Sequence, residues 1–418
     1  MIYKANLIFT PTKDAFEMIP NGYIHVKEDG KIAGVYKTLP AKLSKEPVTD
    51  YGDKLLIPAF YDLHVHAPQY RNLGLAMDLK LLEWLNTYTF PEESKFRDNQ
   101  YAEHVYRRFV HELWMQGTMR SSVFASAHPE ATRILMSLFR EAGLGAYVGL
   151  VGMDRNCPEA VQNTTEQVQA FLEDVVKESD PLVRPIITPR FIPTCSRGML
   201  KMMGEKAKAY RLPVQSHLSE NRDEIRWVRR LMPETICYAD GYRKYGLLGE
   251  TPTLMAHCCY TRGIELRMIK RHKVMVVHCP TSNCNLGSGA APIRRFLDKG
   301  IPVALGTDVS GGHNLSVLRV MQYAIQTSKL YQLLTPRKAF LKVSEAFYLA
   351  TKSGGSFFGQ CGSFEKGYDF DALVVDDAYL NHEHYELNQR IERYIFLGDD
   401  RDIKVRFCAG KEIQEPRL

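Results

Sequence analysis

Residues 55–66 read LLIPAFYDLHVH, an apolar run that ends in two histidines. Continuous apolar runs of this kind predict buried strands. Because alternate residues of a strand point to the same face, His64 and His66 would direct their imidazoles toward one point. A His-x-His pair alone is a weak signal, so its meaning depends on what the rest of the chain supplies.

Seven further apolar runs follow the first one, and helical patterns separate most of them. The runs are residues 118–126, 145–152, 183–191, 213–217, 253–258, 274–278 and 301–308. Helical patterns between them include residues 167–178, 198–210 and 264–271. Strands that alternate with helices predict parallel βαβ units. Eight such units fit a closed (β/α)₈ barrel better than an open, doubly wound sheet.

The two ends of the chain have a different pattern. Residues 1–54 contain short β segments with turns, and similar segments occur at 372–375 and 405–409 near the other end. The pattern predicts a small β-sandwich domain built from residues 1–54 together with 362–418. The (β/α)₈ barrel would then comprise residues 55–361.

Composition narrows the class of protein. The chain has 418 residues, 45% hydrophobic and 24% charged, which suits a globular protein with a large core. Its formal net charge of +6 is spread out, and we expect no binding to nucleic acid or membranes. The nine cysteines include no CxxC pair and predict reduced thiols in a cytoplasmic protein. We expect neither a signal peptide nor a membrane-spanning segment.

Chemistry in barrels of this kind occurs at the carboxyl ends of the strands. The fifth, sixth and eighth runs bring His217, His257 and Asp308 to those ends, beside His64 and His66 of the first run. Imidazole and carboxylate groups suit zinc, iron and other first-row divalent metals. Such a set on four strand ends is hard to obtain by chance, so the residues predict a mononuclear metal hydrolase.

Two further polar residues follow strand ends. Glu220 lies three residues after His217, where a turn would bring its carboxylate back over the metal to carry protons. The alternative is an exposed glutamate in the first turn of a helix. His278 ends the seventh run, and both a direct role and a role in supporting the following loop remain open. These residues do not identify a substrate.

At this point the sequence resembles known proteins. Residues 58–66, with Gly306-Thr307-Asp308 at the last run, look like the amidohydrolase superfamily. Longer stretches resemble guanine deaminases, namely 66–70 (HAPQY), 81–91 (LLEWLNTYTFP), 188–191 (TPRF), 215–221 (QSHLSEN), 307–312 (TDVSGG) and 396–401 (FLGDDR). Ala59 replaces a usual glycine, and Leu63 replaces a usual small or hydroxyl residue. Neither departure removes a proposed ligand.

The resemblance implies an enzyme that converts guanine to xanthine and ammonia by means of a metal-activated water. It implies one divalent metal per chain, zinc or alternatively iron. The ligands carried over are His64, His66, His217 and Asp308. His257 would orient the water, and Glu220 with Asp308 would handle the protons.

The resemblance also implies that Gln69, Arg190 and Phe191 hold the purine. A guanidinium can donate to guanine O6 and N7, and an aromatic face can stack on the ring. Residues 81–90 are interpreted as core and lid packing, with Trp84 as a candidate for direct contact. A homodimer is implied by the family alone.

Two other functions remain as alternatives. The first is an amidohydrolase acting on a triazine, another aminopurine or an adenosine derivative. The second is a non-catalytic barrel, against which the complete ligand set and Glu220 argue.

Overall fold

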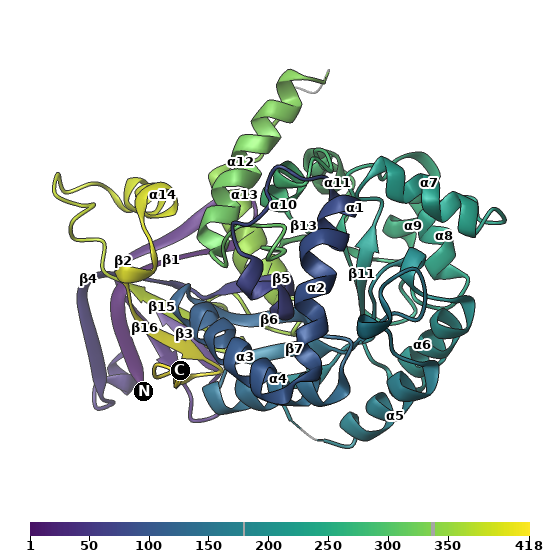
Figure 1. Ribbon diagram of the computed structural model, residues 1–418. Helices are drawn as coiled ribbons and strands as arrows, with labels where there is room; N and C mark the ends of the chain where they lie inside the picture. The colour runs from purple at the N-terminus through teal and green to yellow at the C-terminus, as the bar shows by residue number, and fades with distance from the viewer. Residues whose placement is uncertain (179, 336–338) are drawn as a thin grey trace.

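The computed structural model describes residues 1–178, 180–335 and 339–418. Figure 1 shows a ring of strands and helices beside a smaller layer of strands, which holds both ends of the chain. The larger part is the predicted (β/α)₈ barrel, which is confirmed. No helix in the described part of the chain is long and apolar enough to span a membrane.

The barrel has eight strand positions within the described residues. They are β5 (Phe60–His66), β6 (Thr118–Phe124), β7 (Gly145–Gly149), β9 (Val183–Pro185) with its continuation β10 (Thr188–Pro189), β11 (Val214–Leu218), β12 (Thr253–His257), β13 (Met275–His278) and β14 (Val303–Leu305). All pairs are parallel, in the order β5-β6-β7-β9 and β11-β12-β13-β14. A bridge between Ile187 and Val214 joins the two halves. The short β8 (Val151–Gly152) pairs with β10.

Helices cover the barrel and its carboxyl end. The α-helices are α1 (Leu81–Trp84), α2 (Phe90–Glu93), α3 (Asn99–Met115), α4 (Pro129–Ala142), α5 (Thr165–Val175), α6 (Arg197–Tyr210), α7 (Arg222–Leu231), α8 (Tyr238–Arg243), α9 (Gly263–Arg271), α10 (Pro280–Asn285), α11 (Ile293–Asp298), α12 (Val317–Leu333), α13 (Val343–Tyr348) and α14 (Leu387–Leu397). The π-helices are η3 (Leu85–Thr89) and η7 (Leu349–Ser353). Short 3₁₀ turns are η1 (Ala41–Leu43), η2 (Ala67–Asn72), η4 (Ser94–Arg97), η5 (Glu159–Val161), η6 (Ile192–Thr194) and η8 (Asp400–Asp402).

The helix ends follow local sequence signals. Thr164 precedes α5 and accepts the backbone N–H of Gln167, whose side chain accepts the Thr164 N–H in return. Helix α4 ends at Gly143, whose φ of +70° is the left-handed conformation that favours glycine. The helical patterns at 167–178, 198–210 and 264–271 correspond to α5, α6 and α9.

Both ends of the chain form one seven-stranded sheet. Its strands are β1 (Ile2–Thr12), β2 (Ala15–Val26), β3 (Ile32–Tyr36), β4 (Val48–Pro58), β15 (Ala372–Val375), β16 (Ile403–Cys408) and β17 (Lys411–Glu412), in the order β17-β16-β15-β4-β1-β2-β3. Ile32 on β3 and Phe407 on β16 belong to the same buried cluster, so the sheet curls around its own core. We propose residues 1–54 with 362–418 as this domain and 55–361 as the barrel, although β4 crosses the boundary at residue 54.

The first apolar run is divided between the two sheets, which corrects its interpretation as one strand. Residues 55–58 pair with β15 in the terminal sheet, and only Phe60–His66 joins the barrel. The change occurs at Ala59. Its N–H donates to the Asp371 carbonyl, whereas the N–H of Phe60 donates to Gly117 beside β6. A continuous apolar run does not indicate this change of partners, because both halves are equally buried.

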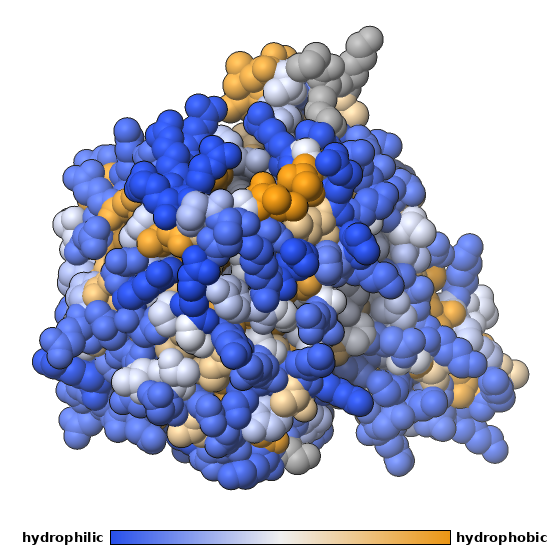
Figure 2. Space-filling view, turned by 90° about the vertical axis from the view of Figure 1, so that its right-hand side faces the viewer, coloured by the Kyte–Doolittle hydropathy of each residue, from blue (hydrophilic) through white to orange (hydrophobic). Residues whose placement is uncertain are grey.

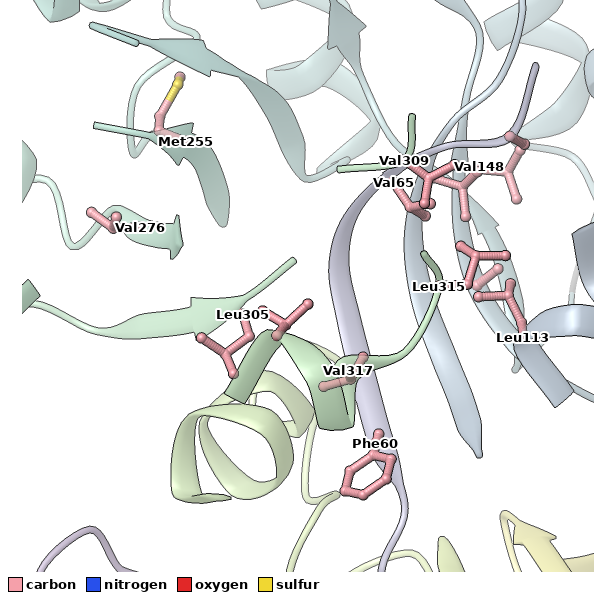
Figure 3. Packing of buried hydrophobic residues seen from close by; sticks show 14 of the residues in the cluster. Phe60, Val65, Leu113, Val148, Met255, Val276, Leu305, Val309, Leu315 and Val317 are labelled. Carbon is pink, nitrogen blue, oxygen red and sulfur yellow. The ribbon is translucent and has the colours of Figure 1, made fainter. Parts of the chain in front are cut away.

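The largest hydrophobic cluster joins the barrel strands to the helices around them (Figure 3). Val65 on β5, Val148 on β7, Leu113 on α3 and Val317 on α12 all belong to it. This packing makes the barrel a rigid frame for groups at its carboxyl end.

A buried arginine links the barrel to the terminal sheet. Arg120 on β6 donates to Asp371 (Nε to Oδ2, 2.7 Å) and to Asp369 (2.9 Å), and only 4% of the residue is exposed. Asp371 also accepts the hydroxyl of Tyr61 at 2.6 Å. The positive charge of the guanidinium therefore compensates the negative charges of two carboxylates at the interface between the domains.

Replacing Arg120 with alanine should destabilise the protein, because it leaves Asp371 buried without its cation. We expect a loss of about 3–5 kcal/mol, measured by chemical denaturation. Arg133→Ala is the matched control, since its partners Glu130, Asp174 and Glu178 are exposed and each such pair contributes about 1 kcal/mol or less. Equal losses of unfolding free energy in the two variants would contradict a special role for the buried Arg120–Asp371 contact.

Candidate active site

Three histidines and an aspartate meet at the carboxyl end of the barrel. His64 and His66 lie on β5, His217 lies on β11 and Asp308 follows β14, and one ligand atom from each lies within 4.8 Å of the others. His66 Nε2 is 3.2 Å from His217 Nε2, and His64 Nε2 is 3.0 Å from Asp308 Oδ1. All four residues are buried. The structure thus brings together the four residues predicted as ligands.

The bonding of these atoms fits a divalent metal. His217 donates its Nδ1–H to the carbonyl of Arg190 at 2.7 Å, which leaves the lone pair of Nε2 directed at His66. His64 Nε2 makes no hydrogen bond, although Asp308 is near enough. Three imidazole nitrogens and a carboxylate form a donor set that first-row divalent cations accept.

Burial prepares these groups to bind a cation. It lowers the pKa of His66 to about 4 and the pKa of His217 well below its ordinary value, so both rings are neutral near pH 7. Burial alone would raise the pKa of Asp308. The neighbouring His64, His66 and His257 together outweigh this effect and hold the pKa of Asp308 well below its usual range. The site therefore presents neutral nitrogens and an ionised carboxylate.

Backbone contacts between the first and eighth strand positions set the position of Asp308. Its N–H donates to the carbonyl of His64 at 2.8 Å. The carboxylate of Asp62 accepts the N–H of Thr307 (3.0 Å), the hydroxyl of Thr307 (2.5 Å) and the N–H of His64 (3.2 Å). These contacts close the barrel at the place where the two strands contribute ligands.

Two backbone features accompany this closure. A Cβ on Gly306 would lie 2.8 Å from the Cβ of His64, so only glycine permits the approach. Asp308 and His257 have φ values of +50° and +69°, which residues with side chains rarely adopt. Such strained conformations cluster at functional sites, and here they aim the two side chains inward.

Glu220 and His257 stand beside the four ligand candidates. His257 Nε2 lies 3.5 Å from Glu220 Oε2 and 3.7 Å from Asp308 Oδ2. Burial, and then the charge of Asp308, raise the pKa of Glu220 to about 8. With 3% of the residue exposed, Glu220 is not the solvated helix residue that the sequence left open. Near neutral pH it is a protonated acid beside an ionised Asp308.

Two supporting residues were missed from the sequence. Ser288 donates its hydroxyl to Glu220 Oε1 at 2.6 Å, and His257 donates from Nδ1 to Asn283 Oδ1 at 2.9 Å. Both follow the seventh run, in and after α10. Serine and asparagine are common in loops, so the sequence does not reveal the roles of these two residues. Only their contacts with Glu220 and His257 across the barrel do.

A cavity opens over the site. Its lining comprises His66, Gln69, Leu81, Trp84, Leu85, Arg190, Phe191, His217, Glu220, His257, Leu286 and Asp308. The four residues predicted to contact the substrate, Gln69, Trp84, Arg190 and Phe191, are therefore on its wall. Their roles remain predictions.

Glu93 was missed from the sequence. It lies at the end of α2, where its carboxylate accepts from Gln69 Nε2 at 2.9 Å and from Arg190 Nη1 at 2.6 Å. The guanidinium of Arg190 also lies over the ring of Phe90, 5.3 Å from its centroid. No local pattern distinguishes Glu93 from Glu92, the preceding carboxylate of the same helix.

His278 does not line the cavity. It is buried, and neither ring nitrogen has a hydrogen-bond partner among the described residues. Burial lowers its pKa to about 3, so the ring is neutral. The described contacts support neither the direct role nor the role in holding the loop that the sequence left open.

Comparison with known proteins agrees with this geometry. The sequence pattern of the Amidohydrolase family matches residues 55–413, and the chain belongs to this family. The guanine deaminase of Dictyostelium discoideum is 36% identical over 442 residues, covering 99% of this chain and 98% of that protein. The guanine deaminase of Escherichia coli (strain K12) is 33% identical over 380 residues, covering 88% and 85%.

A solved structure is similar over the whole fold. The guanine deaminase from C. acetobutylicum, with guanine bound in its active site, superposes with a TM-score of 0.97. It is 49% identical in sequence, and the match covers 99% of both chains.

Replacing His217 with alanine should lower the content of bound divalent metal severalfold, because it removes one of four converging donors. Elemental analysis of the purified protein measures this. His278→Ala is the matched control, since it also removes a buried imidazole from a strand end and should leave the metal content unchanged. Equal metal in both variants would show that His217 is not a ligand.

Proposed function

We propose that this protein hydrolyses guanine at C2 to give xanthine and ammonia. The observation that carries the proposal is the cavity that Gln69 and Arg190 line together with Glu220, Asp308 and the histidines. The relatives named as guanine deaminases, which match nearly the whole chain, support the same substrate.

We infer that His64, His66, His217 and Asp308 hold one metal ion per chain, zinc or alternatively iron. When bound there, such an ion acts as a Lewis acid that lowers the pKa of water toward neutrality. The fit of the donor set supports the assignment. It does not favour one of the two metals.

The protein residues then divide the proton transfers. Asp308 accepts a proton from the attacking water, while Glu220 gives its proton to N3, the ring nitrogen beside C2. Glu220 then takes the hydroxyl proton of the C2 adduct and passes it to the departing amine, and the proton held by Asp308 returns to Glu220 to restore the starting state. His257, between the two carboxylates, orients the water. Two carboxyl groups with opposite pKa shifts suit an acid–base pair.

The cavity wall supports guanine over the alternatives. Arg190 and the amide nitrogen of Gln69 can donate to acceptors such as O6 and N7. Adenine carries an amino group at the position of O6, and triazines lack the fused ring that presents N7. Phe191 and Trp84 offer aromatic surface for the base.

Glu220→Gln tests the mechanism, because the amide keeps the shape but cannot carry the proton. We expect retained metal and a loss of roughly 10²–10⁴ in kcat for xanthine formation from guanine. Asp223→Asn is the control, since this carboxylate is exposed and pairs with Arg226. A Glu220→Gln variant as fast as the parent would contradict the mechanism.

We also propose a cytoplasmic homodimer. The nine cysteines are all free, which suits a reducing compartment. Helix α12 projects from the body in Figure 1, and hydrophobic residues gather at the same end of the molecule in Figure 2. Leu330, Leu333 and Leu334 are exposed there, Leu333 by 82%. Apolar groups gathered in this way favour a protein contact.

Light scattering measures the assembly directly. We expect a mass of twice 47.8 kDa for the parent and a shift toward the monomer for Leu333→Glu. Leu75→Glu, at an exposed leucine that is not part of α12, is the control. A monomeric parent would rule the dimer out.

A further inference from the structure

We propose that Glu93 is a positioning residue that holds Gln69 and Arg190 so that this wall of the cavity offers the base only hydrogen-bond donors. The inference rests on the proposed function and adds to it how the site selects an oxo group at C6. Glu93 itself does not line the cavity, whereas both of its partners do. It would therefore act through them.

Both oxygens of the Glu93 carboxylate accept a side-chain hydrogen bond. Oε1 accepts from Gln69 Nε2 at 2.9 Å, and Oε2 accepts from Arg190 Nη1 at 2.6 Å. Only 2% of Glu93 is exposed, so water does not compete for these bonds. Hydrogen bonds to an ionised, buried partner are stronger than neutral ones, and they restrict both side chains.

A second contact fixes which way the amide of Gln69 faces. The backbone N–H of Ser310 donates to Gln69 Oε1 at 3.0 Å. A rotated amide would set its nitrogen against this N–H and its oxygen against the Glu93 carboxylate. Both contacts would then be repulsive. Gln69 is therefore held with its second N–H available to the cavity.

Glu93 also sets the charge of the wall. Arg190 and Glu93 form a buried ion pair, with side chains 4% and 3% exposed. The pair is neutral as a unit, which suits an uncharged base, while the guanidinium keeps further N–H donors. Without Glu93, the buried cation would lack its partner and its fixed orientation.

These contacts predict how the site discriminates at C6. Guanine presents the acceptor O6, whereas 2,6-diaminopurine carries the same amino group at C2 but a donor at C6. If the wall offers only donors, its N–H groups stay unpaired when 2,6-diaminopurine is bound. A site with unpaired buried donors binds such an analogue much more weakly than the base that satisfies them. Selectivity between these two bases therefore reports on the wall.

The test compares kcat/KM for guanine and for 2,6-diaminopurine. Glu93→Gln adds a donor beside Gln69 and Arg190, so we expect the ratio to fall about tenfold or more, mainly through KM for guanine. Glu92→Gln is the matched control. Glu92 lies on the same helix and is also buried, but it accepts from Lys95 and the hydroxyl of Tyr101. The Glu92→Gln variant should have the same ratio of the two kcat/KM values as the parent. Both the Glu92→Gln and the Glu93→Gln variants should bind as much metal as the parent.

Two further measurements separate positioning from loss of folding. Glu93→Asp keeps an acceptor-only group and should retain more selectivity than Glu93→Gln at a similar melting temperature. Arg190→Ala should lower kcat/KM for guanine by about tenfold to a hundredfold. In the Arg190→Ala protein, Glu93→Gln should change the ratio of the two kcat/KM values less than it does in the parent. The reason is that the contact between Glu93 and Arg190, one of the two through which Glu93 acts, is already absent.

The outcomes distinguish this inference from the proposed function. A parent protein that forms no xanthine from guanine overturns both. A parent that deaminates guanine, together with a Glu93→Gln variant of unchanged selectivity, overturns only the role of Glu93. The role of Glu93 would also be overturned if Glu93→Asp and Glu93→Gln lost selectivity equally. It would be overturned as well if Glu93→Gln changed selectivity by the same factor with and without Arg190.

Discussion

The closure of the barrel between β5 and the residues after β14 is the constraint on which the site depends. Asp308 donates its N–H to His64, and Asp62 binds both Thr307 and His64. In an open sheet, the first and last strands would lie at opposite edges. Closure makes them neighbours, so that β5 and the residues after β14 can supply ligands to one centre. The glycine at position 306 is needed because the two strands approach so closely there.

Burial then gives similar groups different chemistry. Asp308 and Glu220 are both buried carboxyl groups, and desolvation favours the neutral form of each. Asp308 lies among His64, His66 and His257, which together hold its pKa low. For Glu220, burial and the charge of Asp308 outweigh the hydrogen bond from Ser288 and raise the pKa to about 8. The same site therefore contains a base and an acid near neutral pH.

Much of this arrangement could be predicted from the sequence. The alternation of apolar runs with helical patterns indicated the barrel, and residues at strand ends indicated His64, His66, His217 and Asp308. These signals are local or periodic, so a single sequence carries them. The division of residues 55–66 between two sheets was not predictable, because both halves are equally apolar and the change depends on partners at Asp371 and Gly117.

The supporting residues were missed for a related reason. Glu93 and Ser288 act through side chains that are far away in the sequence, at Arg190 and Glu220. Glu92 and Glu93 are neighbouring buried carboxylates of one short helix, and no sequence pattern separates their roles. Only the fold shows which of the two contacts Gln69 and Arg190 on the cavity wall.

The central claim is that the cavity and its ligand set deaminate guanine in preference to other aminated heterocycles. The most direct measurement is the rate of ammonia release from guanine, adenine, cytosine, 8-oxoguanine, melamine and adenosine, with the metal content of the same sample quantified. The account predicts the highest kcat/KM for guanine, with one xanthine formed per ammonia. A higher kcat/KM for any other base, or full activity in exhaustively chelated, metal-free protein, would contradict it.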